Sequence, residues 1–582
     1  METIGWKDFI EAILGEVIDR LKFEWEVSYD FEVDDLAVER PADLANGDFA
    51  SSLALKLAGR LKRPPRQIAE QIADHVRRLI VEQRGDEGDT FLDPFQRVEV
   101  AGPGFINFYL SRAALQSTVI DILVAGEHYG SDFFAEDAEA VNLEYVSANP
   151  TGPMHLGHAR WAALGNAIAN ILEFGGLAVT REFYINDAGH QMEVFGKSID
   201  YRLRELSGAE VGPAPEEFYG GQYVVEIAEQ LLDEDGSSLL DADAAERILR
   251  CREYGYQLML GQTQRFLSGL GIDFDVWFSE RSLYQPDSKG DSAVSRMLNG
   301  LAERGLLERR DGALWFKSSE LGDDKDRVLV KSDQSLTYFA PDIAYHLDKF
   351  ERLEDPEGIL IDIWGADHHG YVARMRAALA AFGLPDGTPE VLLGQLVNLF
   401  RAGEPVRMSK RSGDMVTFAE LVDEVGPDAT IFLLLTKEPN QPIDFDIEQA
   451  KQQDASNPVY YVQYAHARIC SLFAKADPAD LEIALETGRE LAGLDDPHEL
   501  ALMRKLGQFS EVVEEAAFDL APHKLTHYAY ELAADFHKFY TQVNILGAEQ
   551  DLRRQRLALC AACLQIIETC LRLLGVSAPE QM

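Results

Sequence analysis

Cysteine is scarce in this chain, which has five cysteines among 582 residues. The number is odd and the positions are scattered, which argues against a disulfide framework. Cys560 and Cys563 form a single C-x2-C pair inside an apolar helical pattern, and the sequence holds no second pair. We therefore expect core thiols rather than a zinc site, and a cytoplasmic protein.

Long apolar runs are absent as well. No run of about 18 apolar residues occurs, so the sequence predicts no membrane span and no membrane partner. The first residues, METIGWKDFIEA, are too acidic and too often interrupted by polar side chains for a signal peptide. With a hydrophobic share of 46%, the composition is that of a globular protein.

Basic residues are few relative to acidic ones. There are 54 Lys and Arg against 99 Asp and Glu, and the formal net charge is −45. The acids are spread along the chain, which argues against a disordered acidic tail. Such a charge repels nucleic acid at low salt, whereas near 1 M salt the screening length falls to about 3 Å. We infer a halophilic source and expect no DNA partner. The net charge does not exclude an RNA partner, which would have to be recognised by local binding sites.

The length and the changing pattern predict several domains. Residues 1–118 are typical of a small α+β unit. Residues 119–400 alternate strands with helices, which indicates an α/β, Rossmann-like parallel sheet, with a helical insertion at about 205–290. Residues 401–452 form a further region that begins with a basic loop, and residues 453–582 predict an all-α antiparallel bundle.

Periodicity places individual elements in these regions. In the N-terminal unit we expect helices over 6–22 and about 48–60, a helix opening at 63–66, and strands at 27–33 and 102–110. From 120 to 400 we expect a helix at 155–174 and strands at 141–146, 178–185, 313–316, 327–331 and 358–365. The strand pattern fades after about residue 400.

The stretch NPTGPMHLGHAR, residues 149–160, follows a predicted strand and opens a predicted helix. His155 and His158 are three residues apart, which suits a metal site, a phosphate site or an ordinary capped helix. A helix N-terminus at the carboxyl edge of a parallel sheet offers N–H donors to phosphate, and Gly157 leaves room for a flat ring such as adenine. A metal would need further ligands, for which His190 is the only obvious candidate, so we expect no structural metal.

A second informative stretch is RAGEPVRMSKRSGD, residues 401–414. Arg407, Lys410 and Arg411 place three cations within five residues of an otherwise acidic chain. Cations of this kind can stabilise a departing pyrophosphate. The alternative is a solvated basic loop without a function.

Several segments together resemble class I aminoacyl-tRNA synthetases, and arginyl-tRNA synthetases in particular. HLGH and RMSKR are similar to the "HIGH" and "KMSKS" motifs of the class, although Arg407 and Arg411 replace the first lysine and the last serine of the second motif. The segments EYVSANPTGPMHLGHAR, YINDAGHQ, YFAPDIAY, WGADHHGYV and LLGVSAPEQM resemble the arginyl family, and ERPADLANGDFASSLA resembles its N-terminal domain. The resemblance covers essentially the whole chain.

The resemblance implies an arginine–tRNA ligase that uses ATP with Mg²⁺ to form arginyl-adenylate and then charges the 3′ end of tRNA(Arg). It implies an N-terminal domain that touches the tRNA elbow and a C-terminal bundle that binds the anticodon. We also expect a monomer, and no editing domain, because a site built for a guanidinium can reject poorer mimics without editing and the insertion is too short for such a domain. The competing interpretations are a nucleotidylyltransferase that uses H-x-G-H without tRNA, and a catalytically silent tRNA-binding paralogue.

The resemblance also implies four sets of site residues. The catalytic residues are His155, His158 and Lys410. The ATP-binding residues are Pro150, Gly152, His155, Gly157, His158, Asp367, His368, Met408, Ser409 and Lys410. The arginine-binding residues are Glu144, Ser147, Asn149, Gln191, Tyr338 and Asp342. The tRNA-binding residues are Tyr464, His466, Arg468, Tyr540 and Asn544.

Each set has a plain structural alternative. Glu144 and Asp342 could give a guanidinium charge-assisted hydrogen bonds, or they could be a strand-end acid and a helix N-terminal acid. The bundle aromatics could stack on unpaired RNA bases or could fill the bundle core. For Tyr460 and Tyr461 we expect core packing.

Overall fold

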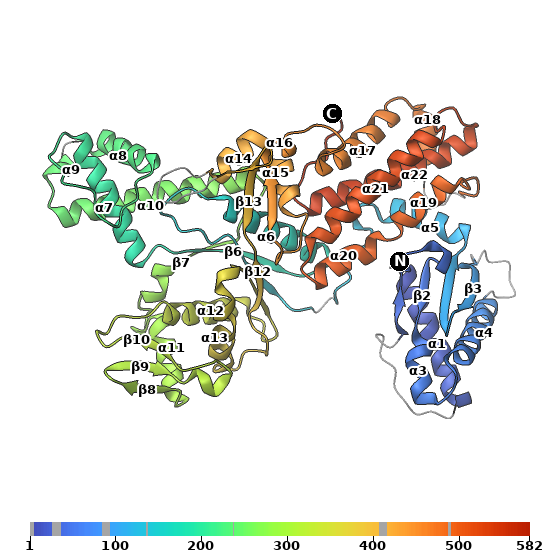
Figure 1. Cartoon of the computed structure of the whole chain (residues 1–582), viewed down its shortest axis with the longest axis horizontal. Coiled ribbons are helices and arrows are strands. Elements are labelled where there is room, and N and C mark those ends of the chain that lie inside the picture. Colours follow the sequence, from blue (N-terminus) through green and yellow to red (C-terminus); the bar gives the residue numbers. More distant parts are fainter. Residues whose placement is uncertain are drawn as a thin grey trace.

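The computed structural model describes residues 5–25, 36–83, 93–135, 138–236, 238–406, 416–486 and 491–582. Figure 1 shows an elongated molecule with a central sheet. The N-terminal unit and a helical unit lie at opposite ends of the long axis, and the C-terminal helices lie between the sheet and the N-terminal unit. None of the described helices combines the length and apolar character needed to cross a membrane.

The N-terminal unit is a four-stranded antiparallel sheet covered by helices. The strand order is β1-β2-β4-β3. Its elements are α1 (Trp6–Trp25), β1 (Val38–Glu39), β2 (Phe49–Ser51), α3 (Leu53–Leu61), α4 (Pro65–Gln83), β3 (Phe95–Ala101) and β4 (Phe105–Leu110). The helix expected at 48–60 was wrong at its start, because residues 49–51 pair with β4 before α3 begins. The strand expected at 27–33 lies outside the described residues.

The central sheet is the parallel sheet that the sequence predicted. Its order is β12-β11-β5-β6-β7, and all four pairings are parallel. The strands are β5 (Val141–Glu144), β6 (Val179–Ile185), β7 (Val276–Ser279), β11 (Ile359–Gly365) and β12 (Glu390–Gly394), and helix α6 (Leu156–Phe174) follows β5. All four residues of β5 are buried, as both faces of a parallel sheet require.

Strand β5 is shorter than the expected 141–146 for a local reason. Val146 and Ser147 have φ angles of 67° and 40°. The left-handed region is costly for a β-branched valine, so the chain leaves the strand here in a strained turn that leads to α6.

A helical unit is inserted between β6 and β7. It consists of α7 (Gly189–Leu206), α8 (Gln222–Asp235), α9 (Ser238–Asp241) and α10 (Ala244–Gly269) around its own core. The unit therefore begins and ends earlier than the expected range of about 205–290. Helix α7 already packs on α8 and α10, and residues 276–279 return to the central sheet as β7.

A second lobe carries a separate antiparallel sheet. Strands β8 (Leu307–Arg310), β9 (Ala313–Phe316) and β10 (Arg327–Val330) pair only with one another in this sheet, next to α11 (Ala293–Glu303), α12 (Phe339–Leu353) and α13 (His369–Ala380). The strands at 313–316 and 327–330 therefore exist where the sequence predicted them, but they do not belong to the parallel sheet. Helix α12 leads directly into β11.

Sheet structure continues beyond residue 400, contrary to the fading pattern. β13 (Val397–Arg401) pairs with β14 (Glu404–Pro405) and, in parallel, with β15 (Ile443–Asp446). The intervening and following helices are α14 (Phe418–Val425), α15 (Pro427–Leu434) and α16 (Ile447–Ala450). These strands are short, and β15 returns some 40 residues after β13, so local periodicity does not reveal the pairing.

The C-terminal region is the predicted helical bundle. It comprises α17 (Pro458–Phe473), α18 (Pro478–Ala484), α19 (Pro497–Leu506), α20 (Phe509–Phe518), α21 (Pro522–Gln542) and α22 (Gln550–Leu573), and α5 (Arg112–Ala125) packs on α19 and α22. Cys560 and Cys563 are fully buried in α22, so they are core thiols as expected.

Candidate active site

A cavity of about 280 Å³ lies at the carboxyl edge of the central sheet. It is lined by residues from the ends of β5, β6 and β11, from α6 and α12, and from the start of α13: Glu144, Val146, Ser147, His155, His158, Trp161, Tyr184, Asp342, Tyr345, His346, Ile363, Trp364, Gly365, His368 and Tyr371. A larger cavity of about 490 Å³ lies between residues 432–458 and 526–531, but none of the motif residues lines it. The position of the smaller cavity is where open α/β sheets bind ligands.

The two motif histidines form the N-terminal cap of α6. His155 Nδ1 accepts a hydrogen bond from Gly157 N at 3.1 Å, and His158 Nδ1 accepts one from His155 N at 3.2 Å. The rings stack with their centroids 3.7 Å apart. Because Nδ1 is the acceptor in both rings, the neutral imidazoles carry their hydrogen on Nε2.

Gly157 lies directly against the histidine cap. A Cβ at this position would lie 2.9 Å from His155 Cε1 and 3.1 Å from its Nδ1. The sequence suggested room for adenine at Gly157; the structure adds that the close neighbour is a ring of the same motif. The preceding turn is supported from the helical unit, where the Tyr223 hydroxyl donates to the Thr151 carbonyl at 2.8 Å.

The strained turn after β5 positions Glu144. Ser147 Oγ donates to Glu144 Oε1 at 2.8 Å and accepts from Tyr184 N at 3.1 Å. The other carboxylate oxygen, Glu144 Oε2, lies 2.6 Å from Lys349 Nζ. Glu144 is 8% exposed, so its carboxylate faces the cavity from a nearly buried position.

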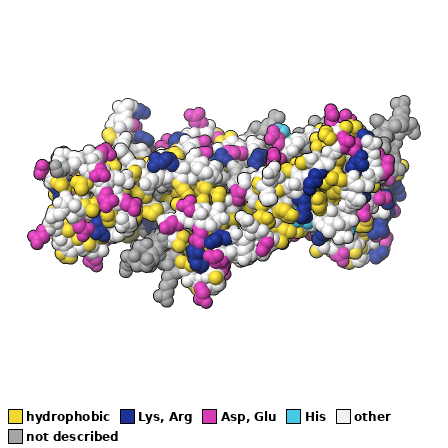
Figure 2. Space-filling model, turned by 90° about the horizontal axis from the view of Figure 1, so that it is seen from above, with side chains coloured by type: hydrophobic (Ala, Val, Ile, Leu, Met, Phe, Trp, Pro, Cys, Tyr) yellow, Lys and Arg dark blue, Asp and Glu magenta, His cyan; other side chains and the backbone are white. Residues whose placement is uncertain are grey.

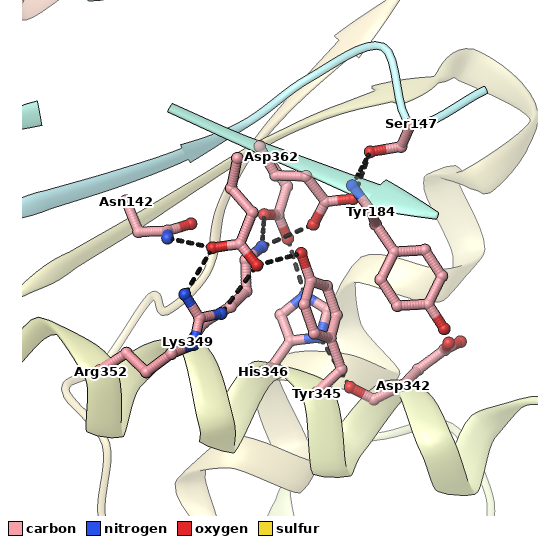
Figure 3. A network of polar contacts seen from close by, with 11 residues as sticks. Asn142, Ser147, Tyr184, Asp342, Tyr345, His346, Lys349, Arg352 and Asp362 are labelled. Carbon is pink, nitrogen blue, oxygen red and sulfur yellow. Dashed lines mark hydrogen bonds and ion pairs between the residues drawn. The ribbon is translucent and has the colours of Figure 1, made fainter. Parts of the chain in front are cut away.

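Lys349 joins two carboxylates beneath the cavity (Figure 3). Its Nζ is 2.6 Å from both Glu144 Oε2 and Asp362 Oδ1. Asp362 Oδ2 lies 2.8 Å from His346 Nε2, and His346 Nδ1 donates to the Asp342 carbonyl at 2.7 Å. The sequence reasoning missed this network, because it depends on β11 lying next to β5.

Asp342 is the second acidic group of the cavity. It lies in the first turn of α12, and the Tyr371 hydroxyl donates to its carboxylate. Burial raises the pKa of Asp342 to about 6; the Tyr371 hydrogen bond opposes this shift, and the nearby charges of Glu280 and Glu144 add to it. Burial similarly holds the pKa of Tyr371 far above its usual range.

Glu280 is a candidate that sequence reasoning missed. It directly follows β7, is 8% exposed, and accepts a hydrogen bond from the Tyr284 hydroxyl at 2.9 Å. Burial raises the pKa of its carboxyl group. Its place after a strand of the parallel sheet was a usable signal, but only once residues 276–279 were known to be a strand of that sheet.

Comparison with known proteins identifies the family. Residues 118–471 match the family model described as "tRNA synthetases class I (R), catalytic domain", residues 7–110 match "Arginyl tRNA synthetase N terminal domain", and residues 462–582 match "DALR anticodon binding domain". The arginine–tRNA ligase of Oceanobacillus iheyensis is 41% identical over 573 residues, which cover 98% of this chain and 99% of that one.

The chain belongs to the arginyl-tRNA synthetase family. The arginine–tRNA ligase of Moorella thermoacetica is 43% identical over 573 residues, 98% of each chain. The structure of Thermus thermophilus arginyl-tRNA synthetase has a TM-score of 0.74 and 24% identity, over 99% of this chain and 100% of that one, and so has the same fold. The resemblance noted in the sequence is confirmed.

Not every residue that the family resemblance implied lies at the cavity. Glu144, Ser147, Asp342, His155, His158 and His368 line it. Pro150 and Gly152 lie in the turn before α6, and a Cβ on Gly152 would come within 2.9 Å of the Tyr223 hydroxyl. Met408, Ser409 and Lys410, with Arg407 and Arg411, lie outside the described residues.

Four other implied residues lie away from the cavity lining. Tyr338 is 76% exposed at the start of α12, and the Asp367 side chain is 84% exposed. Asn149 and Gln191 are both exposed and pair with each other, with Asn149 Nδ2 donating to Gln191 Oε1 at 3.0 Å.

In the synthetase's helical bundle, Arg468 lies between two aromatic rings. Its guanidinium is 4.5 Å from the Tyr464 ring centroid and 4.9 Å from that of Tyr540, and it donates to the Tyr464 hydroxyl at 2.8 Å. Tyr461 packs against Tyr530 and His537, as expected for a core residue.

His466 is a buried member of the tRNA-binding set that the resemblance implied. It is 4% exposed, and its Nδ1 lies 3.0 Å from the Pro579 carbonyl, so it fastens the C-terminal segment to α17. Its place in the tRNA-binding set stays a prediction, and the sequence does not show that residues after α22 fold back over this face. Asn544 is exposed, and its Oδ1 accepts from Gly547 N at 3.0 Å.

Proposed function

We propose that this chain, an arginine–tRNA ligase of class I, binds arginine and ATP in the cavity between β5, α6 and α12. The observation that carries the proposal is the meeting of two acidic side chains, Glu144 and Asp342, with two histidines at a helix N-terminus around one cavity. Acidic groups suit the cationic ends of arginine, and the helix start suits phosphate.

In the first step, a carboxylate oxygen of arginine attacks the α-phosphorus of ATP, and pyrophosphate leaves. Arginyl-adenylate forms. His155 and His158 donate from Nε2 to phosphate oxygens, which is the tautomer that their Nδ1 contacts favour. Positioning and charge stabilisation carry most of such a reaction.

The nucleotide site extends from this helix start. Pro150, Gly152, Gly157, His368 and the more exposed Asp367 are proposed neighbours of ATP, and the metal enters with the substrate as Mg-ATP. Met408, Ser409 and Lys410 complete the site, with Lys410 acting on the departing pyrophosphate. Among the described residues, no cluster of His, Cys, Asp or Glu suits a resident metal ion.

Arginine occupies the acidic part of the cavity. Glu144 and Asp342 take its cationic groups, and Ser147 borders Glu144. Asn149, Gln191 and Tyr338 are proposed contacts at the exposed edge, where Asn149 and Gln191 already pair. Glu280 joins this set because its charge acts on Asp342.

In the second step, the terminal 2′-OH of tRNA(Arg) attacks the acyl carbon of the adenylate, and AMP leaves. We assign residues 1–118 to the tRNA elbow, 401–452 to the signature loop and acceptor-stem region, and 453–582 to the anticodon. Tyr464, Arg468, Tyr540 and Asn544 are the proposed RNA contacts of the bundle. The enzyme acts as a cytoplasmic monomer in this proposal.

The arginine assignment is tested by Asp342→Asn and Glu144→Gln in steady-state charging of tRNA. Each variant should raise the arginine KM by about tenfold or more, because a hydrogen bond to a charged group is lost, while the ATP KM stays near the wild-type value. Asp348→Asn is a matched control on the same helix, since Asp348 pairs with Arg352 and does not line the cavity. Unchanged arginine kinetics in both variants would remove the two carboxylates from the site.

A further inference from the structure

The buried ammonium of Lys349 is the one cation in the network beneath the cavity that touches a cavity-lining carboxylate, among the described residues. Its side chain is fully buried, and Asp362 beside it is fully buried too. Figure 3 shows that Lys349 rises from α12 toward the neighbouring strands. Neither Lys349 nor Asp362 lines the cavity, so neither reaches a substrate there.

The strand register explains why a cation is needed here. Glu144 on β5 and Asp362 on β11 are direct partners across the parallel ladder, so their side chains leave the sheet on the same face. Like charges placed opposite each other on neighbouring strands are destabilising. Two buried carboxylates without a cation would turn apart, or one would take up a proton. Lys349 touches both at 2.6 Å and removes this conflict.

The balance of charge matters for the ligand side of Glu144. The Lys349 ammonium balances one of the two negative charges of Glu144 and Asp362, and His346, whose Nε2 lies 2.8 Å from Asp362 Oδ2, faces Asp362 from its other oxygen. The contact to Lys349 uses Glu144 Oε2, and Ser147 fixes Oε1. A carboxylate has about four acceptor sites on its two oxygens, so Glu144 retains capacity for a further donor.

We propose that Lys349 is a positioning residue of the arginine site: it balances the paired charges of Glu144 and Asp362, so that Glu144 remains a carboxylate directed at the cavity. The proposal rests on the proposed role of Glu144 in arginine binding. Lys349 acts through Glu144 and has no contact with arginine or ATP.

The competing explanation is that Lys349 only supports the fold. The neighbouring pair on the same helix separates the two accounts. Arg352 lies one turn beyond Lys349 on α12 and pairs through two bonds of 2.7 and 2.9 Å with Glu182, a fully buried carboxylate on β6. Glu182 does not line the cavity. Arg352→Met therefore also removes the paired cation from a buried carboxylate, but from one that does not line the cavity.

The experiment compares full-length variants in steady-state aminoacylation, with arginine and ATP varied separately. Lys349→Met should raise the arginine KM by about tenfold or more, with kcat and the ATP KM within about twofold of wild type. Lys349→Arg keeps the charge and should recover much of the arginine affinity. Arg352→Met should leave the arginine KM near the wild-type value, whatever it does to the melting temperature.

A charge-balanced variant keeps the test decisive where Lys349→Met does not fold. Lys349→Met with Asp362→Asn removes one positive and one negative charge. The network around Glu144 therefore keeps the net charge that it has in the wild type. We expect its arginine KM to fall back toward wild type. An arginine KM as poor as that of Lys349→Met, or equal losses in Arg352→Met, would overturn the positioning role.

Failure of this inference can be told apart from failure of the proposed site. Glu144→Gln is measured in the same series. A raised arginine KM in Glu144→Gln with an unchanged KM in Lys349→Met overturns the role of Lys349 alone. An unchanged arginine KM in Glu144→Gln itself overturns the assignment of Glu144, and the role of Lys349 with it.

Discussion

Burial controls the chemistry of individual residues in the proposed arginine pocket. Asp342 is the clearest case, because burial raises the pKa of its carboxyl group to about 6, against the hydrogen bond from Tyr371. Only the ionised form attracts a guanidinium strongly. The pocket is therefore poised so that its affinity for arginine depends on pH just below neutrality.

The arginine KM should rise as the pH is lowered through about 6, because Asp342 takes up a proton there. Tyr371→Phe removes the hydrogen bond that favours the carboxylate and should move this midpoint to higher pH. Steady-state charging at fixed, saturating ATP between about pH 5 and 8 measures both. A midpoint that does not move in Tyr371→Phe would contradict the assignment.

Protonation of Asp342 has the opposite effect on the stability of the fold. The folded-state pKa lies above the ordinary value, so the folded state binds this proton more tightly than the unfolded chain does. The contribution of Asp342 to stability therefore increases as the pH falls from about 6 toward its ordinary value. Protonation of Asp342 itself therefore does not destabilise the fold in this range.

Residue types in the cavity were partly predictable from the sequence. Glu144, Asp342, His155 and His158 belong to segments whose order resembles the family. Lys349 was not predictable, because its role comes from the pairing of β5 with β11, more than 200 residues apart. Residues that act through tertiary neighbours leave no local pattern to read.

At the scale of elements, the histidine-bearing helix is tied to the strands that flank the signature loop. Arg160 on α6 is fully buried and donates to the carbonyls of Gln395 at 2.7 Å and Glu438 at 2.9 Å. Burial lowers the pKa of its guanidinium to about 10. The two carbonyls lie before β13 and before β15, so one side chain joins α6 to both.

Arg160→Met should lower the free energy of unfolding by about 2–4 kcal/mol, because two buried carbonyls lose their donors. Arg160→Lys should fall between this variant and the wild type, since an ammonium reaches fewer acceptors in a fixed geometry. Thermal or urea unfolding of the purified variants measures the difference. Wild-type stability in Arg160→Met would show that the two bonds contribute little.

The aromatic and cationic face of α17 and α21 gives a prediction about RNA. Arg468→Gln should raise the tRNA KM by about tenfold, since stacking and cation contacts are each worth about 1–3 kcal/mol per base, and should leave the arginine KM unchanged. Lys524→Gln removes a cation from the far end of α21, where Lys524 pairs with Asp519, and serves as the control. Equal effects of both variants would indicate only a general loss of positive charge.

Element prediction succeeded where periodicity was long and failed where pairing was remote. The bundle helices and the strands at 179–185 and 359–365 follow their own patterns. Residues 49–51 form a strand because β4 lies beside them, and β13 and β15 are too short to stand out. The boundary of the helical insertion likewise depended on which sheet receives residues 276–279.

At the scale of the whole molecule, ion pairs join the N-terminal unit to the C-terminal bundle. Arg40 binds both carboxylate oxygens of Glu511 at 2.7 Å, and Arg504 binds the nearly buried Asp48 at 2.8 Å, so the N-terminal unit is fastened to the bundle. On the face shown in Figure 2, acidic side chains are scattered rather than gathered in one patch.

The net charge of −45 predicts that salt stabilises the enzyme. Self-repulsion of the acidic surface weakens as the screening length falls from about 10 Å at 0.1 M to about 3 Å at 1 M, while the partly buried ion pairs are screened less. The melting temperature should therefore rise between about 0.1 and 1 M potassium chloride. An unchanged or lower value would contradict both this prediction and the inferred halophilic source.

The central claim is tested most directly by charging bulk tRNA with each amino acid in turn, using the full chain in high potassium chloride. The account predicts that arginine alone is esterified to tRNA, with ATP consumed. Charging of a different amino acid, binding of tRNA without charging, or transfer of the adenylyl group to a small acceptor in the absence of tRNA would contradict it.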